Sequence, residues 1–339
     1  MPKQKHILVI RLSAMGDVAI SVPVLRAFIA QNPSVKLTIL TRPFFAPLFN
    51  ELPNVSIFNI DLKNKHKGFF GLYKLSKELK HLGITEVADL HNVLRTNILK
   101  FFLSVKTFKQ IDKGRKEKKA LVLGKEFKQL KTSYQRYADV FVKLGYTLDL
   151  HNPTFPKPLT FPTFSPLKEK ELSKPLIGIA PFAQYESKMY PLDKMAEVIK
   201  YLSQDYNVLL FGGGLKEEEQ LNVFEIENTN VYNMAGKVSF EDELALISNL
   251  KLMISMDSGN GHLAAMFGVK VITIWGNTHP YAGFVPFNQP IENQLVPNKK
   301  DFPLLPTSIY GNKTPENYKT VAGTISPTVV TTLINQVLK

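Results

Sequence analysis

The chain of 339 residues contains no cysteine, which excludes disulfide bonds, thiolate nucleophiles and cysteine-ligated zinc. This absence suits a reducing cytoplasm. No apolar run reaches the roughly 20 residues that a membrane-spanning helix needs. The first apolar run is interrupted by Arg11 and Asp17, so we expect no signal peptide. We therefore expect a cytoplasmic protein.

The chain also lacks several phosphate and metal motifs. It has no Gly-x-x-x-x-Gly-Lys-Ser/Thr sequence, no Asp-x-Asp pair and no His-x-x-x-His pair, so a P-loop and the usual metal clamps are not expected. The turn Gly212-Gly-Gly214 is followed by Glu217 and does not match Gly-x-Gly-x-x-Gly. A carboxylate at such a turn could accept hydrogen bonds from ribose hydroxyls.

Acidic residues are few relative to basic ones, and the formal net charge is +13. A strongly basic chain favours nucleic acid, an anionic membrane surface or anionic small molecules as partners. Much of the excess lies between residues 63 and 131. No recognisable nucleic-acid module accompanies it, so we do not expect nucleic acid as a partner.

Apolar segments of strand and helix type alternate along the chain. This order predicts an α/β protein with doubly wound parallel sheets. The predicted strands cover residues 7–10, 37–40, 55–60, 86–90, 176–180, 208–211, 231–233, 252–256 and 269–275. The first predicted helix ends at about residue 30, and Pro23 must either kink it or mark the start of its regular part. The other predicted helices cover residues 69–81, 96–103, 132–144, 191–202, 217–225, 240–248, 262–267 and 326–338.

A chain of this length suggests two domains. Six prolines crowd residues 151–175, which is typical of a connection between domains. We therefore predict two Rossmann-like domains, residues 1–165 and 166–325, followed by a helical segment, residues 326–339. The apolar face of that last helix must be buried, and packing on the first domain is one outcome.

Residues 252–275 form the most informative stretch, which is read as a strand, a polar turn, a helix and a second strand. Asp257 and Ser258 could cap the helix through their side-chain oxygens. Gly259 and Gly261 allow the backbone to approach a ligand closely. Free amides at a helix start bind phosphate or diphosphate, although any strand-turn-helix connection also needs a cap and a glycine.

Three side chains have both a structural and a chemical interpretation. Asp17 follows the first strand and could cap a helix or act as a general base. Lys188 lies in a loop after a strand, where it could be solvated or could bind a diphosphate. His262 could be a buried structural histidine or part of the anion-binding turn.

These motifs together resemble the family 9 glycosyltransferases, the ADP-heptose:lipopolysaccharide heptosyltransferases and their relatives. The resemblance covers most of the chain and is weakest over residues 60–170. It rests on Arg11-Leu-Ser-Ala-Met-Gly-Asp-Val18 with Pro23, residues 89–95, Lys188 with Pro191, residues 212–217, Met234-Ala-Gly-Lys-Val-Ser239, Asp257-Ser-Gly-Asn-Gly-His-Leu-Ala-Ala265 and Trp275-Gly-Asn-Thr278. One departure is Asn260-Gly261, where the family usually has Pro-Met or a similar pair before the histidine.

The resemblance implies a GT-B fold, with two Rossmann-like domains facing a central cleft. It implies inverting transfer of a heptose-like sugar from a nucleotide-diphosphate donor, with neither metal nor cofactor. Asp17 would be the catalytic base in the first, acceptor-binding domain. The second domain would bind the donor, and the implied donor-binding residues are Lys188, Glu217, Val238, Asp257, Ser258, Gly259 and His262.

The implied acceptor is a lipopolysaccharide core or a related anionic surface glycan. Ser13, Gly16, Arg95 and Arg115 are the candidate acceptor-binding residues. The basic first domain could also bring the protein to the inner face of the inner membrane through peripheral contact with anionic lipid. Two alternatives stay open, namely a nucleotide-sugar epimerase of the same architecture and a non-catalytic protein that binds nucleotide or glycan.

Overall fold

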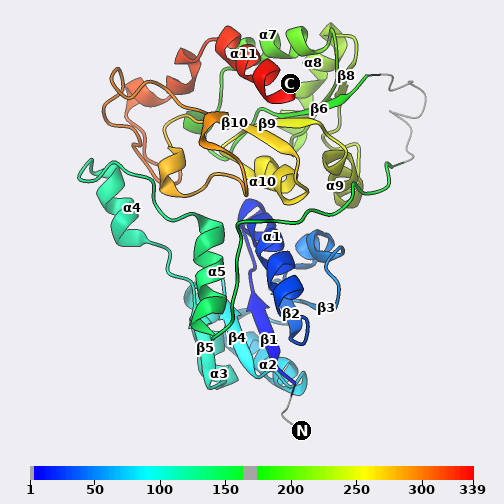
Figure 1. Ribbon diagram of the computed structural model, residues 1–339, viewed down its shortest axis with the longest axis vertical. Coiled ribbons are helices and arrows are strands. Elements are labelled where there is room, and N and C mark those ends of the chain that lie inside the picture. Colours follow the sequence, from blue (N-terminus) through cyan, green and yellow to red (C-terminus); the bar gives the residue numbers. More distant parts are fainter. Residues whose placement is uncertain (1–3, 163–173) are drawn as a thin grey trace. The chain divides into compact units, whose positions relative to one another are not determined.

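The computed structural model describes residues 4–162 and 174–339. Contacts between Cα atoms divide the chain into two compact units, shown in Figure 1. The first unit comprises Met1–Lys113 and Ser133–Thr154, and the second comprises Gly114–Thr132 and Phe155–Lys339. The predicted boundary between residues 165 and 166 lies outside the described residues.

The first unit is built on a parallel five-stranded sheet with the order β3-β2-β1-β4-β5. Its central strand β1 is buried along its whole length, as expected for a parallel sheet covered on both faces. Helices α1 and α5 pack together, as do α2 and α3. The elements are β1 His6–Ile10, α1 Met15–Gln31, β2 Lys36–Thr41, the short helix η1 Pro43–Phe49, β3 Val55–Asn59, α2 Gly68–His81, β4 Glu86–Asp89, α3 Leu94–Leu103, β5 Thr107–Gln110 and α5 Ser133–Lys143.

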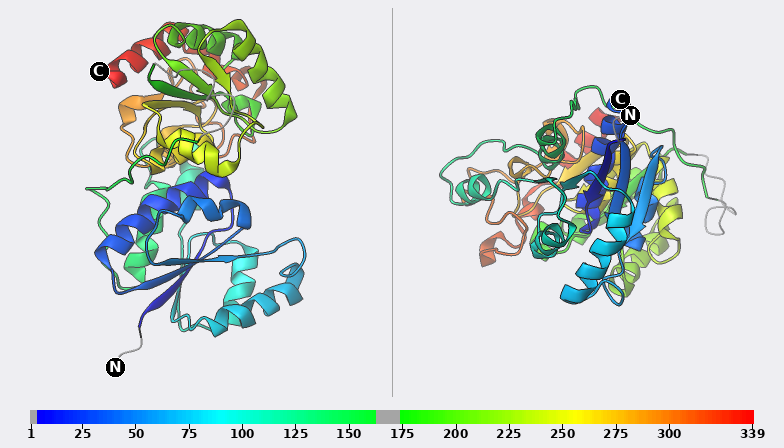
Figure 2. Two further views of the ribbon diagram at one scale, coloured as in Figure 1. Left: turned by 90° about the vertical axis from the view of Figure 1, so that its right-hand side faces the viewer. Right: turned by 90° about the horizontal axis from the view of Figure 1, so that it is seen from below.

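The second unit contains a parallel six-stranded sheet with the order β11-β10-β9-β6-β7-β8. If β6 is numbered as strand 1, the order is 6-5-4-1-2-3, which read from the other edge is the 3-2-1-4-5-6 order of a dinucleotide-binding fold. The helices lie on both faces of the sheet (Figure 2). The strands are β6 Leu176–Ala180, β7 Asn207–Leu210, β8 Val231–Asn233, β9 Leu252–Met256, β10 Lys270–Ile274 and β11 Gln294–Leu295. The helices are α4 Arg115–Val122, η2 Glu186–Lys188, α7 Leu192–Leu202, α8 Leu215–Glu227, α9 Phe240–Ser248, α10 Gly259–Met266, η3 Pro280–Ala282, η4 Ile291–Asn293, η5 Glu316–Tyr318, η6 Val321–Thr324 and α11 Pro327–Leu338.

The prediction of two Rossmann-like parallel sheets is confirmed. One of the two readings of Pro23 is wrong, because α1 begins at Met15 and Pro23 lies inside the helix rather than at its start. The proline is tolerated there even though its ring removes one backbone hydrogen bond. Its burial, together with that of its neighbours in α1, shows that this part of the helix faces the core.

The last helix packs within the second unit. Ser326 caps α11 by accepting a hydrogen bond from the Val329 amide. Val330 and Ile334 lie one turn apart on the helix and are both completely buried in the core of the second unit. Helix α11 packs beside α7, as Figure 1 shows.

Residues 114–132 were predicted to belong to the first domain, but their contacts place them in the second unit. Leu121 and Leu130 form a small apolar cluster with Ala282. The Leu130 amide donates a hydrogen bond to the Tyr281 carbonyl at 2.9 Å. The chain therefore passes between the two units at three positions.

Helix α10 begins at Gly259, three residues before its predicted start at residue 262. The two glycines disfavour a helix by intrinsic propensity, but packing on β9 overrides that preference. A Cβ atom on Gly261 would lie 2.5 Å from the Ser255 Oγ atom. The glycine therefore permits a close approach that another residue would block.

Burial raises the pKa of Glu243, on α9, to about 7 from its usual 4.5. The folded state therefore holds this proton more tightly than the unfolded state, and stability falls as the pH rises from about 4.5 through about 7. We expect Glu243→Gln to stabilise the protein well above pH 7 by up to about 3 kcal/mol, since one pKa unit corresponds to about 1.4 kcal/mol. Below pH 4.5 the two proteins should be alike in urea unfolding.

The control for this prediction is Glu241→Gln on the same helix. Glu241 is exposed, so its replacement should change the unfolding free energy by less than about 0.5 kcal/mol at either pH. A Glu243→Gln protein with the same pH dependence of stability as the wild type would contradict the assigned burial effect.

Candidate active site

The first candidate site lies at the carboxyl end of β1, where Asp17 occupies the first turn of α1. Its carboxylate forms an ion pair with Arg11 and accepts a 3.4 Å hydrogen bond from the Ala14 amide. The guanidinium of Arg11 is buried, while the Asp17 side chain remains 35% exposed. The carboxylate is thus anchored on one side and accessible on the other, as a proton acceptor must be.

The anchor is itself held by the surrounding structure. Arg11 donates a 2.6 Å hydrogen bond to the Leu90 carbonyl, which follows the neighbouring strand β4. Its guanidinium lies 5.6 Å from the ring centre of Tyr137, a distance suited to a cation–π contact. The buried Tyr137 hydroxyl donates to the Asp17 carbonyl at 3.3 Å. Two strands and two helices therefore fix the position of the carboxylate.

A second polar group, around His91, follows β4 at the same edge of the sheet. Asp89 accepts 2.9 Å hydrogen bonds from the amides of His91 and Asn92. Burial, helped by the positive charges of Arg11 and Lys113, lowers the pKa of His91 to about 3. His91 is therefore a neutral imidazole at physiological pH.

In the second unit, the start of α10 is the candidate anion site. Ser258 occupies the N-cap position, but the predicted side-chain cap is absent. Its buried Oγ atom forms no hydrogen bond with the described residues. A buried hydroxyl without a partner is unfavourable, and the first amides of a helix also lack intrahelical partners. These groups together could bind an anion.

Asp257 does not cap α10 either, because its carboxylate has other partners. Its Oδ2 atom lies 2.8 Å from the Lys188 ammonium and accepts a 2.9 Å hydrogen bond from the Thr278 hydroxyl. Asp257 is buried and Lys188 is mostly buried, with side-chain exposures of 8% and 13%. The structure thus brings these two predicted residues together beside the start of α10.

Two glycines allow other segments to pack closely on the loop that carries Lys188. A Cβ atom on Gly311 would lie 2.5 Å from its Cδ atom, and one on Gly276 would lie 2.1 Å from the Ser187 carbonyl oxygen. The Asn277 amide donates to that same carbonyl at 2.9 Å. The loop before α7 is therefore packed directly on the turn that follows β10.

This packing predicts that Gly276→Ala destabilises the protein by about 1 to 3 kcal/mol, as overpacking of a close contact does. The Lys188 loop would be displaced, so any activity that depends on Lys188 should fall as well. The control is Gly213→Ala, since a Cβ atom there would meet no atom within 4 Å. Thermal unfolding of both variants tests the prediction, and equal midpoints for the two would contradict it.

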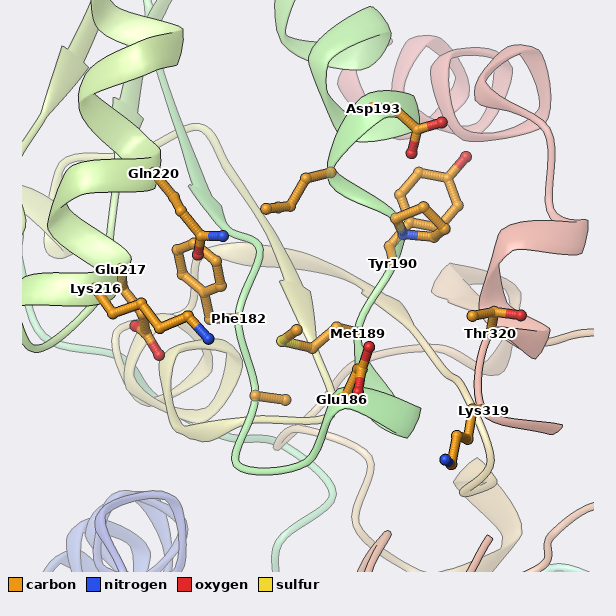
Figure 3. Close-up of a pocket in the computed structure, with 13 residues that line it drawn as sticks. Phe182, Glu186, Met189, Tyr190, Asp193, Lys216, Glu217, Gln220, Lys319 and Thr320 are labelled. Carbon is orange, nitrogen blue, oxygen red and sulfur yellow. The ribbon is translucent and has the colours of Figure 1, made fainter. Parts of the chain in front are cut away.

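A cavity of about 680 Å³ lies near these residues in the second unit, within the size range of small-molecule sites. Figure 3 shows Glu217 and Lys216 on one side of it, Tyr190 at the start of α7, and Lys319 on the other side. Glu217 accepts a 2.8 Å hydrogen bond from the Gly213 amide. The described residues that line this cavity do not include Lys188, Asp257 or Val238.

The remaining predicted residues are placed as follows. His262 is buried in α10, and Val238 is half-buried just before α9. Ser13 and Gly16 lie on either side of the start of α1. Arg95 lies on α3, and its positive charge contributes to the lowered pKa of His91. Arg115 lies at the start of α4 in the second unit, so the two predicted arginines belong to different units.

The sequence analysis assigned no role to Arg11, His91 or Thr278. Arg11 was identified as an interruption of an apolar run and as part of the first motif of the resemblance, although an arginine directly after a buried strand is also a signal for a site at the sheet edge. His91 and Thr278 each follow a strand within a motif that carried the resemblance. The carboxyl ends of neighbouring parallel strands meet at one edge, which could have indicated all three.

Groups of at least three His, Asp or Glu residues that could hold a metal ion were sought among residues 4–162 and 174–339, and none was found. Metal independence of the reaction stays a prediction. Within the same residues, no helix is both long enough and apolar enough to cross a membrane.

Comparison with known proteins agrees with this arrangement. The family model "Glycosyltransferase family 9 (heptosyltransferase)" matches residues 72–305, more than half of the chain. Lipooligosaccharide heptosyltransferase 2 of Haemophilus influenzae is 26% identical over 300 residues, which covers 81% of this chain and 84% of the relative.

Solved structures show the same fold. A family 9 glycosyltransferase of Veillonella parvula has a TM-score of 0.73 at 18% identity and covers 100% of this chain and 98% of that chain. The ADP-heptose lipopolysaccharide heptosyltransferase II of Escherichia coli has a TM-score of 0.68 at 22% identity, with 98% of both chains covered. The GT-B fold class, with two parallel-sheet α/β domains, is thereby confirmed. The chain belongs to glycosyltransferase family 9 and is a glycosyltransferase enzyme.

Proposed function

We propose that this enzyme transfers heptose from ADP-heptose to a lipopolysaccharide core or a related surface glycan, with inversion and without a metal ion. Heptosyl transfer is supported by the names of its relatives, which include a lipooligosaccharide heptosyltransferase and an ADP-heptose enzyme. The observation that carries the mechanism is the anchored, partly exposed carboxylate of Asp17 at the ligand-binding edge of its sheet.

In the proposed mechanism Asp17 removes the proton from the acceptor hydroxyl. The acceptor oxygen attacks the anomeric carbon while the bond from that carbon to the diphosphate oxygen breaks. The bonding electrons leave with the nucleoside diphosphate, and the anomeric configuration inverts. One carboxylate suffices for a single displacement, whereas retention with a covalent intermediate would use a second carboxylate.

The departing diphosphate gains negative charge, which the second unit would stabilise. Free amides at the start of α10 near Gly259 and the buried hydroxyl of Ser258 would donate hydrogen bonds. The ammonium of Lys188 has three donors, and its ion pair with Asp257 aligns it beside this helix end. Fixed donors of this kind stabilise a developing charge without reorganising.

The rest of the donor would be bound by neighbouring groups of the second unit. Glu217 would accept hydrogen bonds from the ribose at the edge of the cavity that it lines. Backbone near Val238 would contact the base, Asp257 would orient the sugar, and His262 would support the diphosphate turn. The nucleotide-sugar is a substrate here, and no cofactor is proposed.

The acceptor would be an anionic glycolipid or saccharide. Ser13 and Gly16, which flank the start of α1 with Asp17, would contact the reacting sugar. Arg95 and Arg115 would bind its anionic groups. We place the enzyme in the cytoplasm, with peripheral contact to the inner face of the inner membrane.

The proposal is tested by incubating the enzyme with lipopolysaccharide-core acceptors and a panel of nucleotide-sugars that includes ADP-heptose. Release of ADP that depends on the acceptor, with an inverted linkage in the product, is the expected result, and added chelator should leave the rate unchanged. An epimer formed without acceptor would instead identify an epimerase. Donor binding without release of nucleoside diphosphate for any acceptor would identify a non-catalytic protein.

A further inference from the structure

Helices α2 and α3 of the first unit expose large apolar side chains. Phe70, at the start of α2, is 85% exposed, and Phe101, near the end of α3, is 77% exposed. Leu94 is also 77% exposed and lies two turns before Phe101, on the same face of α3. Apolar side chains this exposed contribute nothing to the core, and a group of them usually marks an interaction surface.

These side chains belong to a connected aromatic cluster. The half-buried ring of Phe102 lies between the others, with its centre 4.9 Å from the ring of Phe69, 5.4 Å from that of Tyr73 and 5.7 Å from that of Phe101. The ring of Phe70 lies 5.9 Å from Phe69. Helices α2 and α3 pack side by side, as Figure 1 shows, so the cluster forms one patch.

Helices α2 and α3 also carry positive charge, and the ammonium of Lys77 lies 5.2 Å from the ring centre of Tyr73. Exposed lysines lie on or beside the same two helices: Lys67, Lys74, Lys77, Lys80 and Lys100. Glu78 is the one acidic residue in the sequences of α2 and α3, and it pairs with Lys65 at 2.9 Å. We call this region, made of Phe69, Phe70, Tyr73, Phe101, Phe102 and the five lysines, the aromatic–lysine surface.

We propose that the aromatic–lysine surface docks on a bilayer that contains anionic lipid. Exposed aromatic rings can enter the boundary between headgroups and acyl chains, while nearby lysines contact the anionic headgroups. A second copy of this chain fits the surface poorly, because the two sets of lysines would face each other and repel. The charges therefore favour a partner with a negatively charged surface and an apolar interior, such as an anionic bilayer, over self-association.

The inference rests on the proposed function, since a lipid-linked acceptor is what would bring this enzyme to a membrane. Its test uses neither donor nor acceptor, so its failure is distinct from a failure of glycosyl transfer. The full-length protein is mixed with vesicles of phosphatidylcholine and phosphatidylglycerol in equal parts, and with vesicles of phosphatidylcholine alone. We expect binding to the anionic vesicles that weakens with added salt, because salt screens exposed charges.

Two variants then separate the aromatic and ionic contributions. Lys74→Gln/Lys77→Gln/Lys80→Gln should lower the partition coefficient about 100-fold, because each lysine near an anionic surface contributes about 1 kcal/mol. Phe70→Ser/Phe101→Ser should lower it by at least about 100-fold, since each buried aromatic ring contributes more than about 1.5 kcal/mol. The side chains replaced in both variants are exposed, so the folding of the variants should be unaffected. Glycosyl transfer to a short, lipid-free acceptor should persist.

The matched controls lie in the second unit. Leu215→Ser/Ile226→Ser removes side chains of α8 that are as exposed as the phenylalanines, and Lys200→Gln/Lys251→Gln/Lys300→Gln removes three exposed lysines. Both controls should bind vesicles as the wild type does. The proposal is overturned if the wild type does not bind anionic vesicles, or if the α2–α3 variants bind them as tightly as the wild type. It is also overturned if light scattering shows a dimer of the wild type that Phe70→Ser/Phe101→Ser abolishes.

Discussion

Asp17→Asn is expected to lower kcat for glycosyl transfer about 1,000-fold, within the range that loss of a general base produces. An amide has the shape of the carboxylate but cannot accept the acceptor's proton. Donor affinity, measured by calorimetry, should stay within about threefold of the wild type, because the proposed donor contacts all lie in the second unit. The effect should therefore appear in kcat and not in donor binding.

Asp17 also has a structural role, which a control must separate from catalysis. The Asn variant leaves the buried guanidinium of Arg11 without its anionic partner, and the protein should lose stability for that reason. Glu51→Gln breaks a comparable ion pair with Arg26 in the same unit. It should lower the unfolding midpoint but keep turnover. An Asp17→Asn enzyme with near-normal kcat on a verified pair of substrates would refute the assigned base.

The strands were predictable because buried parallel strands are nearly continuous apolar runs. The predicted bounds of β6, β8, α9 and β9 are those of the structure. Strand β5 was missed because its sequence, Thr-Phe-Lys-Gln, is polar and half-exposed, and its pairing with β4 defines it. Helix α4 was not predicted, because its sequence is dominated by charged residues and its buried Leu121 packs in a cluster with Leu130 and the distant Ala282.

The sequence predicted which residues would form the candidate site but not which of them would contact one another. The sequence indicated Lys188 and Asp257 separately, yet their ion pair depends on how the loop before α7 packs on Gly276. Asp257 could have capped α10 by its position, but the hydroxyl of Thr278 and the ammonium of Lys188 compete successfully for it. Local capping rules cannot include partners that only the tertiary fold supplies.

This pairing gives Lys188 two roles, one in catalysis and one in stability, which different variants can separate. As a catalytic group it would stabilise the departing diphosphate, and as a structural group it neutralises the buried carboxylate of Asp257. Removing one partner of a buried ion pair costs about 3 to 5 kcal/mol, whereas removing both can be neutral. Stability and activity should therefore separate in a double-variant cycle.

Lys188→Met is expected to lower kcat about 100-fold to 1,000-fold, as loss of one electrostatic donor to a developing charge does. The same variant should lose about 3 to 5 kcal/mol of unfolding free energy, because Asp257 is left charged and buried. Lys188→Met/Asp257→Asn should recover most of that stability, since the amide is uncharged and can still accept the Thr278 hydrogen bond. It should not recover transfer, because the donor diphosphate still lacks its ammonium.

Lys237→Met provides the matched control, because Lys237 pairs with Glu225 at the same 2.8 Å distance but at 30% and 26% exposure. Its loss should cost less than about 1 kcal/mol, as for other surface pairs, and leave kcat unchanged. Recovery of both stability and transfer in Lys188→Met/Asp257→Asn would show that Lys188 serves only to neutralise Asp257. The diphosphate would then depend on the Ser258 end of α10 for its charge stabilisation.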